Sequence, residues 1–104
     1  MPTVELIYAA DCPNVEDAQA QLLRAFADVG LPARWKEWDR AGWGSPPHAR
    51  RYGSPTILVD GEDVAGLAPS DGADCCRVYA DPEGRLRGVP SVEMIVSALR
   101  VKAS

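Results

Sequence analysis

The order of the predicted elements assigns this chain to the α/β fold class. Residues 3–8 form a predicted strand, residues 13–30 an amphipathic helix and residues 33–38 a second strand. A hairpin after Pro55 and a final helix capped by Ser91 complete the order. Because a helix joins the first two strands, they should be parallel, and the hairpin should add antiparallel strands. We therefore expect a central mixed sheet flanked by helices.

Two periodicities define the first strand and the first helix. Residues 3–8 alternate with a period close to two, and one face consists of Val4, Leu6 and Tyr8. From residue 13 the apolar residues recur at intervals of three and four, at Val15, Ala18, Leu22, Phe26 and Val29. Pro13 suits the first helical position and Gly30 suits the C-terminal end. The chain thus changes from strand to helix near residue 12.

The central part of the chain contains the second strand and an irregular connection. Large apolar and charged residues alternate over residues 33–38, and Trp35 is expected to pack in the core. Residues 39–53 are rich in glycine, proline and polar residues. Ser45 is a favourable N-cap and prolines follow it, so we expect a short helix that runs through Arg51.

Turn residues organise the C-terminal half. The dipeptide Asp60-Gly61 between two apolar runs predicts a hairpin. Its neighbours Glu62 and Asp63 are expected to be solvated, as acidic residues at turns usually are. Residues 76–80 are a candidate short strand, which a turn connects to residues 85–87.

The composition is that of a single domain, residues 1–104, large enough to bury one core. A net charge of −4 and a pI near 4.8 argue against nucleic acid or an anionic membrane surface as a partner, because both require a cationic surface. The chain has no apolar run long enough to span a membrane, and its N-terminus lacks the pattern of a secretory signal. We expect a cytoplasmic protein, and its oligomeric state stays open.

Three cysteines, Cys12, Cys75 and Cys76, are the candidates for chemistry. Their spacing is not that of a secreted disulfide framework, so any of them can be a free thiol. Cys12 stands where strand gives way to helix, and the unpaired N–H groups and helix dipole at such a place favour the thiolate. A thiolate attacks disulfides and binds soft metals. The alternative is that Cys12 caps the helix or packs in the core.

Two motifs resemble the thioredoxin-like fold family, namely Cys12-Pro13-Asn14-Val15 after the first strand and Gly53-Ser54-Pro55-Thr56 before the hairpin. The resemblance covers nearly the whole chain. It implies that Cys12 is the nucleophilic thiol, that the Ser54–Pro55 bond is cis, and that substrate is bound by Ser54, Pro55 and Thr56. Val15 stands where the family has its second cysteine. Cys12 would therefore act alone or with a distant thiol.

Cys76 is the preferred distant thiol. Neighbouring residues of a strand point to opposite faces, so only one of Cys75 and Cys76 should face Cys12. In a strand that begins at Cys76, this residue would share the inward face with the apolar Val78. Cys75 is the additional candidate thiol. The alternative is that both cysteines fill space without reacting.

A narrower resemblance concerns small bacterial thioredoxin-like proteins labelled alkylmercury-lyase related. The shared segments are Cys-Pro-Asn, Gly-Ser-Pro-Thr, Val-Asp-Gly, Cys-Arg-x-Tyr and Pro-Ser-Val. The resemblance implies that the thiolates of Cys12 and Cys76 hold mercury and that Asp11 protonates the leaving carbon. Asp11 is alternatively a solvated or helix-capping residue. The single His48 is expected to be exposed and to lack the neighbours that a zinc site needs.

Three functions are compatible with these residues. In the first, Cys12 attacks a disulfide or a glutathione-type substrate, and Cys76 resolves the mixed disulfide. In the second, Cys12 and Cys76 bind a soft metal ion such as mercury. In the third, a non-catalytic module holds a peptide beside Ser54 and Pro55. No cofactor is expected, since Gly42-Trp43-Gly44 lacks the Lys-Ser/Thr pair of a phosphate loop.

Overall fold

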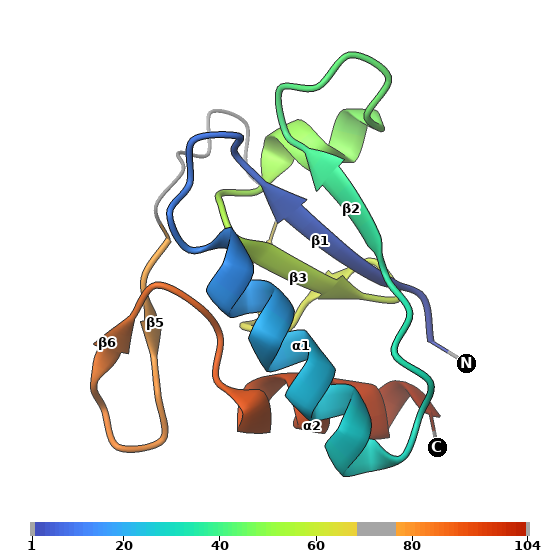
Figure 1. The fold of residues 1–104 in the computed structure, drawn as a ribbon, viewed down its shortest axis with the longest axis vertical. Coiled ribbons are helices and arrows are strands. Elements are labelled where there is room, and N and C mark those ends of the chain that lie inside the picture. Colours follow the sequence, from blue (N-terminus) through green and yellow to red (C-terminus); the bar gives the residue numbers. More distant parts are fainter. Residues whose placement is uncertain (1, 69–76, 104) are drawn as a thin grey trace.

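A mixed sheet, covered by helices on one face, organises the chain. The computed structural model describes residues 2–68 and 77–103 (Figure 1). The elements in this part of the chain are β1 (Val4–Tyr8), α1 (Val15–Val29), β2 (Lys36–Asp39), the 3-10 helix η1 (Pro47–Arg51), β3 (Thr56–Val59), β4 (Glu62–Asp63), β5 (Tyr79–Ala80), β6 (Leu86–Arg87) and α2 (Val92–Ala103).

The sheet has the predicted mixture of strand directions. Within the described residues four strands pair in the order β2-β1-β3-β4. β1 and β2 are parallel, with Glu5 opposite Lys36 and Tyr8 opposite Asp39. β3 pairs with β1 and with β4 in the antiparallel direction. The α/β class and the parallel first pair are therefore confirmed.

The predicted turn joins β3 to β4. Asp60 and Gly61 both have positive φ, at 51° and 81°. Two central residues with positive φ are the mark of a type I′ turn, whose twist matches that of the flanking strands. The turn brings Glu62 opposite Val59 and Asp63 opposite Leu58.

The main core lies between the sheet and the two helices, which cover the same face (Figure 1). Alternation along β1 and β3 directs every second residue to this core, as the period of two predicts. The buried residues of the core are Val4, Leu6, Ala18, Leu22, Ala25, Phe26, Ile57, Val59, Ile95, Val96 and Leu99. Trp35 packs against the core with its ring stacked 6.1 Å from that of Phe26.

A smaller core covers the opposite face of the sheet. Ile7 of β1 and Leu58 of β3 pack there against Ala49 and Tyr52 from η1 and the residue that follows it. Trp38 lies at the border of this cluster. The sheet is thus packed on both faces, which fixes the strand ends that carry the candidate site.

Two local signals set helix ends as predicted. Gly30 has a φ of 72° at the end of α1, the left-handed conformation that glycine adopts without a steric penalty. The Ser91 hydroxyl accepts a hydrogen bond of 3.1 Å from the N–H of Met94, so it caps α2. In the part of the chain that the structure describes, neither α-helix is long and apolar enough to cross a membrane.

The predicted starts of β2 and of the short helix are wrong. β2 begins at Lys36 and not at residue 33, because its pairing with β1 begins at Lys36 opposite Glu5. The short helix is a 3-10 helix capped by Pro46, with no side-chain cap. Ser45 lies one residue too early, and its N–H is bonded to the carbonyl of Gly42 at 3.2 Å.

Candidate functional site

Cys12 lies in the turn between β1 and α1. Its N–H donates a hydrogen bond of 2.9 Å to the carbonyl of Ala9, and its free thiol is half-buried. The first residue of α1 is Val15 and the N-cap is Asn14, so Pro13 is not the first helical residue as predicted. The helix starts later because the carbonyl of Asn14 accepts its first backbone hydrogen bond, from Ala18. Cys12 therefore precedes the N-cap by two residues.

Gly88 lies close to the side chain of Asn14, the N-cap of α1. A Cβ atom at Gly88 would lie 2.3 Å from the side-chain nitrogen of Asn14, a distance that real Cβ atoms do not show. Glycine is thus the residue that allows the chain after β6 to approach the N-cap so closely.

Ser54 connects the proline segment to the Cys12 turn. Its hydroxyl oxygen accepts a hydrogen bond of 2.8 Å from the N–H of Ala9, three residues before Cys12. The Ser54–Pro55 peptide bond is cis, as predicted. The predicted substrate-binding residues Ser54, Pro55 and Thr56 are all buried. Their side chains therefore serve the packing of the segment and the hydrogen bonds within the chain.

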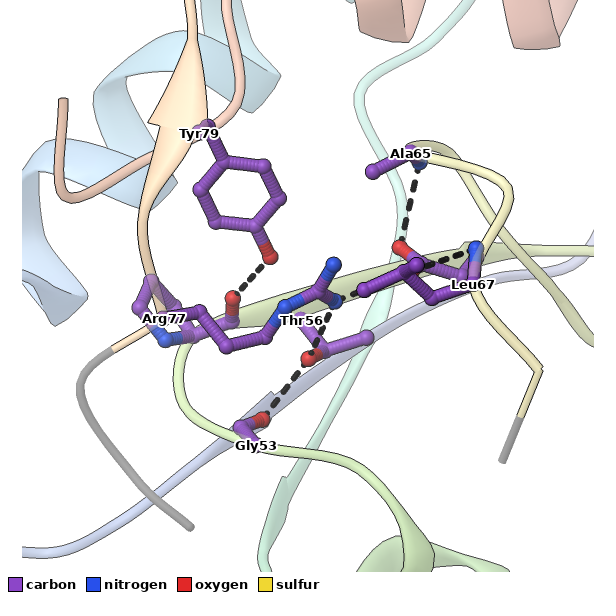
Figure 2. A network of polar contacts seen from close by, with 8 residues as sticks. Gly53, Thr56, Ala65, Leu67, Arg77 and Tyr79 are labelled. Carbon is purple, nitrogen blue, oxygen red and sulfur yellow. Dashed lines mark hydrogen bonds and ion pairs between the residues drawn. The ribbon is translucent and has the colours of Figure 1, made fainter. Parts of the chain in front are cut away.

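Three consecutive carbonyl groups of this segment accept hydrogen bonds from the chain itself. Thr56 Oγ1 donates to the Gly53 carbonyl at 2.7 Å, the Arg77 N–H donates to the Ser54 carbonyl at 2.9 Å, and the Tyr79 hydroxyl donates to the Pro55 carbonyl. Figure 2 shows Arg77 and Tyr79 directed at this segment. Arg77 also donates to Thr56 Oγ1 at 2.9 Å. Residues 77 and 79 therefore hold the segment through its main-chain carbonyls.

The prediction that the acidic residues of the hairpin are solvated is wrong for Asp63. Its side chain is fully buried, and its carboxylate lies 3.0 Å from Arg77 Nη1. The same carboxylate accepts hydrogen bonds from the N–H groups of Ala65 and Leu67 (Figure 2). A buried charge requires a partner of opposite sign and satisfied hydrogen bonds, and Asp63 has both.

The structure also reverses the face assignment that favoured Cys76. Tyr79 is buried and the Arg77 side chain is only 11% exposed, whereas Val78 is 63% exposed. The guanidinium of Arg77 lies 4.5 Å above the Tyr79 ring, a cation–π contact that holds both inward. The prediction of an inward Val78 is therefore wrong, and the strand β5 begins only at Tyr79. Cys75 and Cys76 lie outside the described residues.

The burial of Tyr79 predicts a loss of stability in alkali. Desolvation raises the pKa of its hydroxyl well above the ordinary value of 10.0, although the Arg77 charge opposes the shift. An acid whose pKa is raised by folding contributes its full stability below the unfolded-state pKa and loses it as the pH rises beyond that value. The free energy of unfolding should fall from about pH 10 upward. Urea titrations of the parent and Tyr79→Phe will measure this, and an equal alkaline slope in both proteins would refute it.

Asp11 lies in the Cys12 turn itself, whereas His48 lies in η1. Asp11 is exposed, and the N-cap is Asn14, so the expected capping role is wrong and a solvated residue remains. His48 is less exposed than predicted and has a carboxylate neighbour, since its Nε2 lies 2.9 Å from Glu5 Oε2. The same oxygen accepts from Trp38 at 2.7 Å. Among the described residues, no three His, Cys, Asp or Glu side chains form a group that could hold a metal ion.

Arg77, Tyr79 and Asp63 are the residues of this region to which the sequence alone assigned no role in the site. Each of them looks solvated or merely packed when its neighbours in the sequence are considered. The available signal was the alternation of Arg77 and Tyr79 around Val78, which places a charge and a phenol on one face.

Comparisons of the chain with protein-family models, curated proteins and solved structures gave no match.

Proposed function

We propose that this chain is a thioredoxin-like domain that carries out thiol–disulfide exchange through Cys12. The observation that carries the proposal is the hydrogen bond from the Ala9 N–H to Ser54 Oγ, which ties the cysteine turn to the buried proline segment. The sheet order β2-β1-β3-β4 with both α-helices on one face supports the fold assignment. The proposal places the protein in the cytoplasm, where thiols remain reduced.

The proposed reaction requires three reactants: the Cys12 thiolate, a disulfide substrate and a second thiol. The Cys12 thiolate bonds to one sulfur of a disulfide, the S–S bond breaks, and the other sulfur leaves as a thiolate that takes up a proton. A second thiol of the same chain then attacks the Cys12 sulfur, forms an intramolecular disulfide and releases the bound half of the substrate as a thiol. A thiol from solution instead attacks the substrate sulfur and returns Cys12 to the free thiol. The half-buried position of Cys12 leaves part of the residue accessible to such a reagent.

The second thiol in this scheme comes from the chain or from the solution. The preference for Cys76 rests on an inward Val78, and Val78 is exposed. Both Cys75 and Cys76 must therefore be tested. Cys76 remains a candidate for the second thiol because it directly precedes Arg77, whose N–H is bonded to the Ser54 carbonyl.

Reduced protein treated with oxidised glutathione should form a mixed disulfide at Cys12. Mass spectrometry of the digested protein will locate the adduct, and Cys12→Ser should abolish it. The matched variants Cys75→Ser and Cys76→Ser should still form it, and the one that removes a resolving thiol should accumulate it. An adduct confined to Cys75 or Cys76 in the parent protein would refute the proposal.

The same variants test the soft-metal alternative. Mercuric ion binds thiolates strongly, and a pair of thiolates binds more tightly than one. If Cys12→Ser and Cys76→Ser both lose mercury affinity while the parent exchanges no disulfide, the metal function replaces the redox function.

A further inference from the structure

The edge of the sheet next to the candidate site is covered by the chain itself. β4 pairs with β3 only through Glu62 and Asp63, and the last bond beyond them joins the Val64 N–H to the Ile57 carbonyl. The chain then turns away, with Gly66 at a φ of 79°. The side of β3 that precedes Ile57 is thereby left without a neighbour from β4. An uncovered strand edge is the structure to which extended peptides add as a further strand.

Arg77 and Tyr79 occupy that position, and we call these two residues with their contacts the edge latch. The main chain of Arg77 bonds to Ser54 as a neighbouring strand would, through its N–H and the Ser54 carbonyl. Side chains secure the contact, because Arg77 binds Thr56 and Asp63, and the Tyr79 hydroxyl binds the Pro55 carbonyl. The Asp63 carboxylate is fully buried, so this anchor is shielded from water.

We infer that the edge latch closes this side of the sheet to extended peptides, so that Cys12 acts on low-molecular-weight disulfides. The inference rests on the proposed function. A peptide that carried a disulfide to Cys12 would pair with the strand edge at Ser54, because the Ser54 hydroxyl is bonded to Ala9 of the Cys12 turn. The carbonyls of Gly53, Ser54 and Pro55 each accept a hydrogen bond within the chain. A small disulfide requires none of these groups.

Two reagents with the same leaving group test this specificity. One is the 2-thiopyridyl mixed disulfide of cysteine, and the other is a short extended peptide whose cysteine carries the same 2-thiopyridyl group. Their rates are measured on a Cys75→Ser/Cys76→Ser protein, so that Cys12 alone releases thiopyridone. Variants that loosen the latch are Tyr79→Phe and the double variant Arg77→Met/Asp63→Asn, which removes both members of the ion pair.

The parent protein should react no faster with the peptide than with the small reagent. In Arg77→Met/Asp63→Asn, loosening the latch should raise the peptide rate relative to the small reagent about tenfold, because a hydrogen bond to a charged group contributes about that factor to keeping the contact formed. Tyr79→Phe removes a neutral hydrogen bond to the Pro55 carbonyl, so its increase should be smaller, about threefold. A parent protein that prefers the peptide, or folded latch variants whose rate ratio is unchanged, would overturn the inference. Tyr79→Phe keeps the test valid if the double variant does not fold.

Hydrogen exchange separates failure of the inference from failure of the proposed function. The Arg77 amide should be protected in the parent and should exchange faster in Tyr79→Phe, whatever the reactivity of Cys12. If Cys12 reacts with neither reagent while the Arg77 amide is protected, the proposed thiol–disulfide exchange is wrong. The inference that the edge latch closes the sheet edge is then retained. An Arg77 amide that exchanges as in an unfolded chain would overturn the latch itself.

Discussion

Replacing Phe26 by alanine should lower the free energy of unfolding by about 3–5 kcal/mol. Phe26 belongs to α1, is 2% exposed and lies in the main core, where its ring stacks on Trp35 with an interplanar angle of 13°. The substitution leaves a cavity that the surrounding strands cannot fill, since the sheet is packed on both faces. A loss of this size is a large part of the stability of a small domain, which is about 5–15 kcal/mol.

The same helix supplies the control for this measurement. Leu23 also belongs to α1, but its side chain is 53% exposed, so Leu23→Ala should change the stability by less than about 0.5 kcal/mol. Urea denaturation followed by circular dichroism will give both values. Similar losses for the two variants would show that α1 does not bury the face described for it.

Local sequence patterns were sufficient to predict the elements whose conformation depends only on adjacent residues. The period of two in β1, the turn at Asp60-Gly61 and the cap at Ser91 each depend on a few adjacent residues, and each is confirmed. β2 was misplaced because the length of a strand depends on its partner. Lys36 is the first residue opposite β1, and the alternation around Trp35 contains no information about that pairing.

The candidate site was predictable where a motif is continuous in the sequence. Cys12 and Ser54 were singled out from short segments, and the structure joins their surroundings through Ala9. The network of Asp63 and Arg77 was not predictable in this way. Its members are separated by the residues between the hairpin and β5, and each charge alone favours solvent. Burial of the pair depends on the fold that brings them together.

Removing one member of that buried pair should cost about 3–5 kcal/mol, because the other charge is left in the interior without a partner. Arg77→Met is the direct case, since it leaves the fully buried carboxylate of Asp63 with only the N–H groups of Ala65 and Leu67. The methionine retains most of the volume of the side chain, so the loss reports the charge and not a cavity. Urea denaturation at neutral pH will measure it.

Two further variants decide whether burial of the pair causes this loss. Arg85→Met removes an arginine that is 69% exposed and lies 3.5 Å from an equally exposed Glu83, and it should change the stability by less than about 1 kcal/mol. Arg77→Met/Asp63→Asn removes both charges of the buried pair and should recover a large part of the stability that Arg77→Met loses, because no unpaired charge remains inside. If the double variant is less stable than Arg77→Met, the Asp63 carboxylate is stabilised by the N–H groups of Ala65 and Leu67 even without the arginine, and an unpaired buried charge is not the cause of the loss.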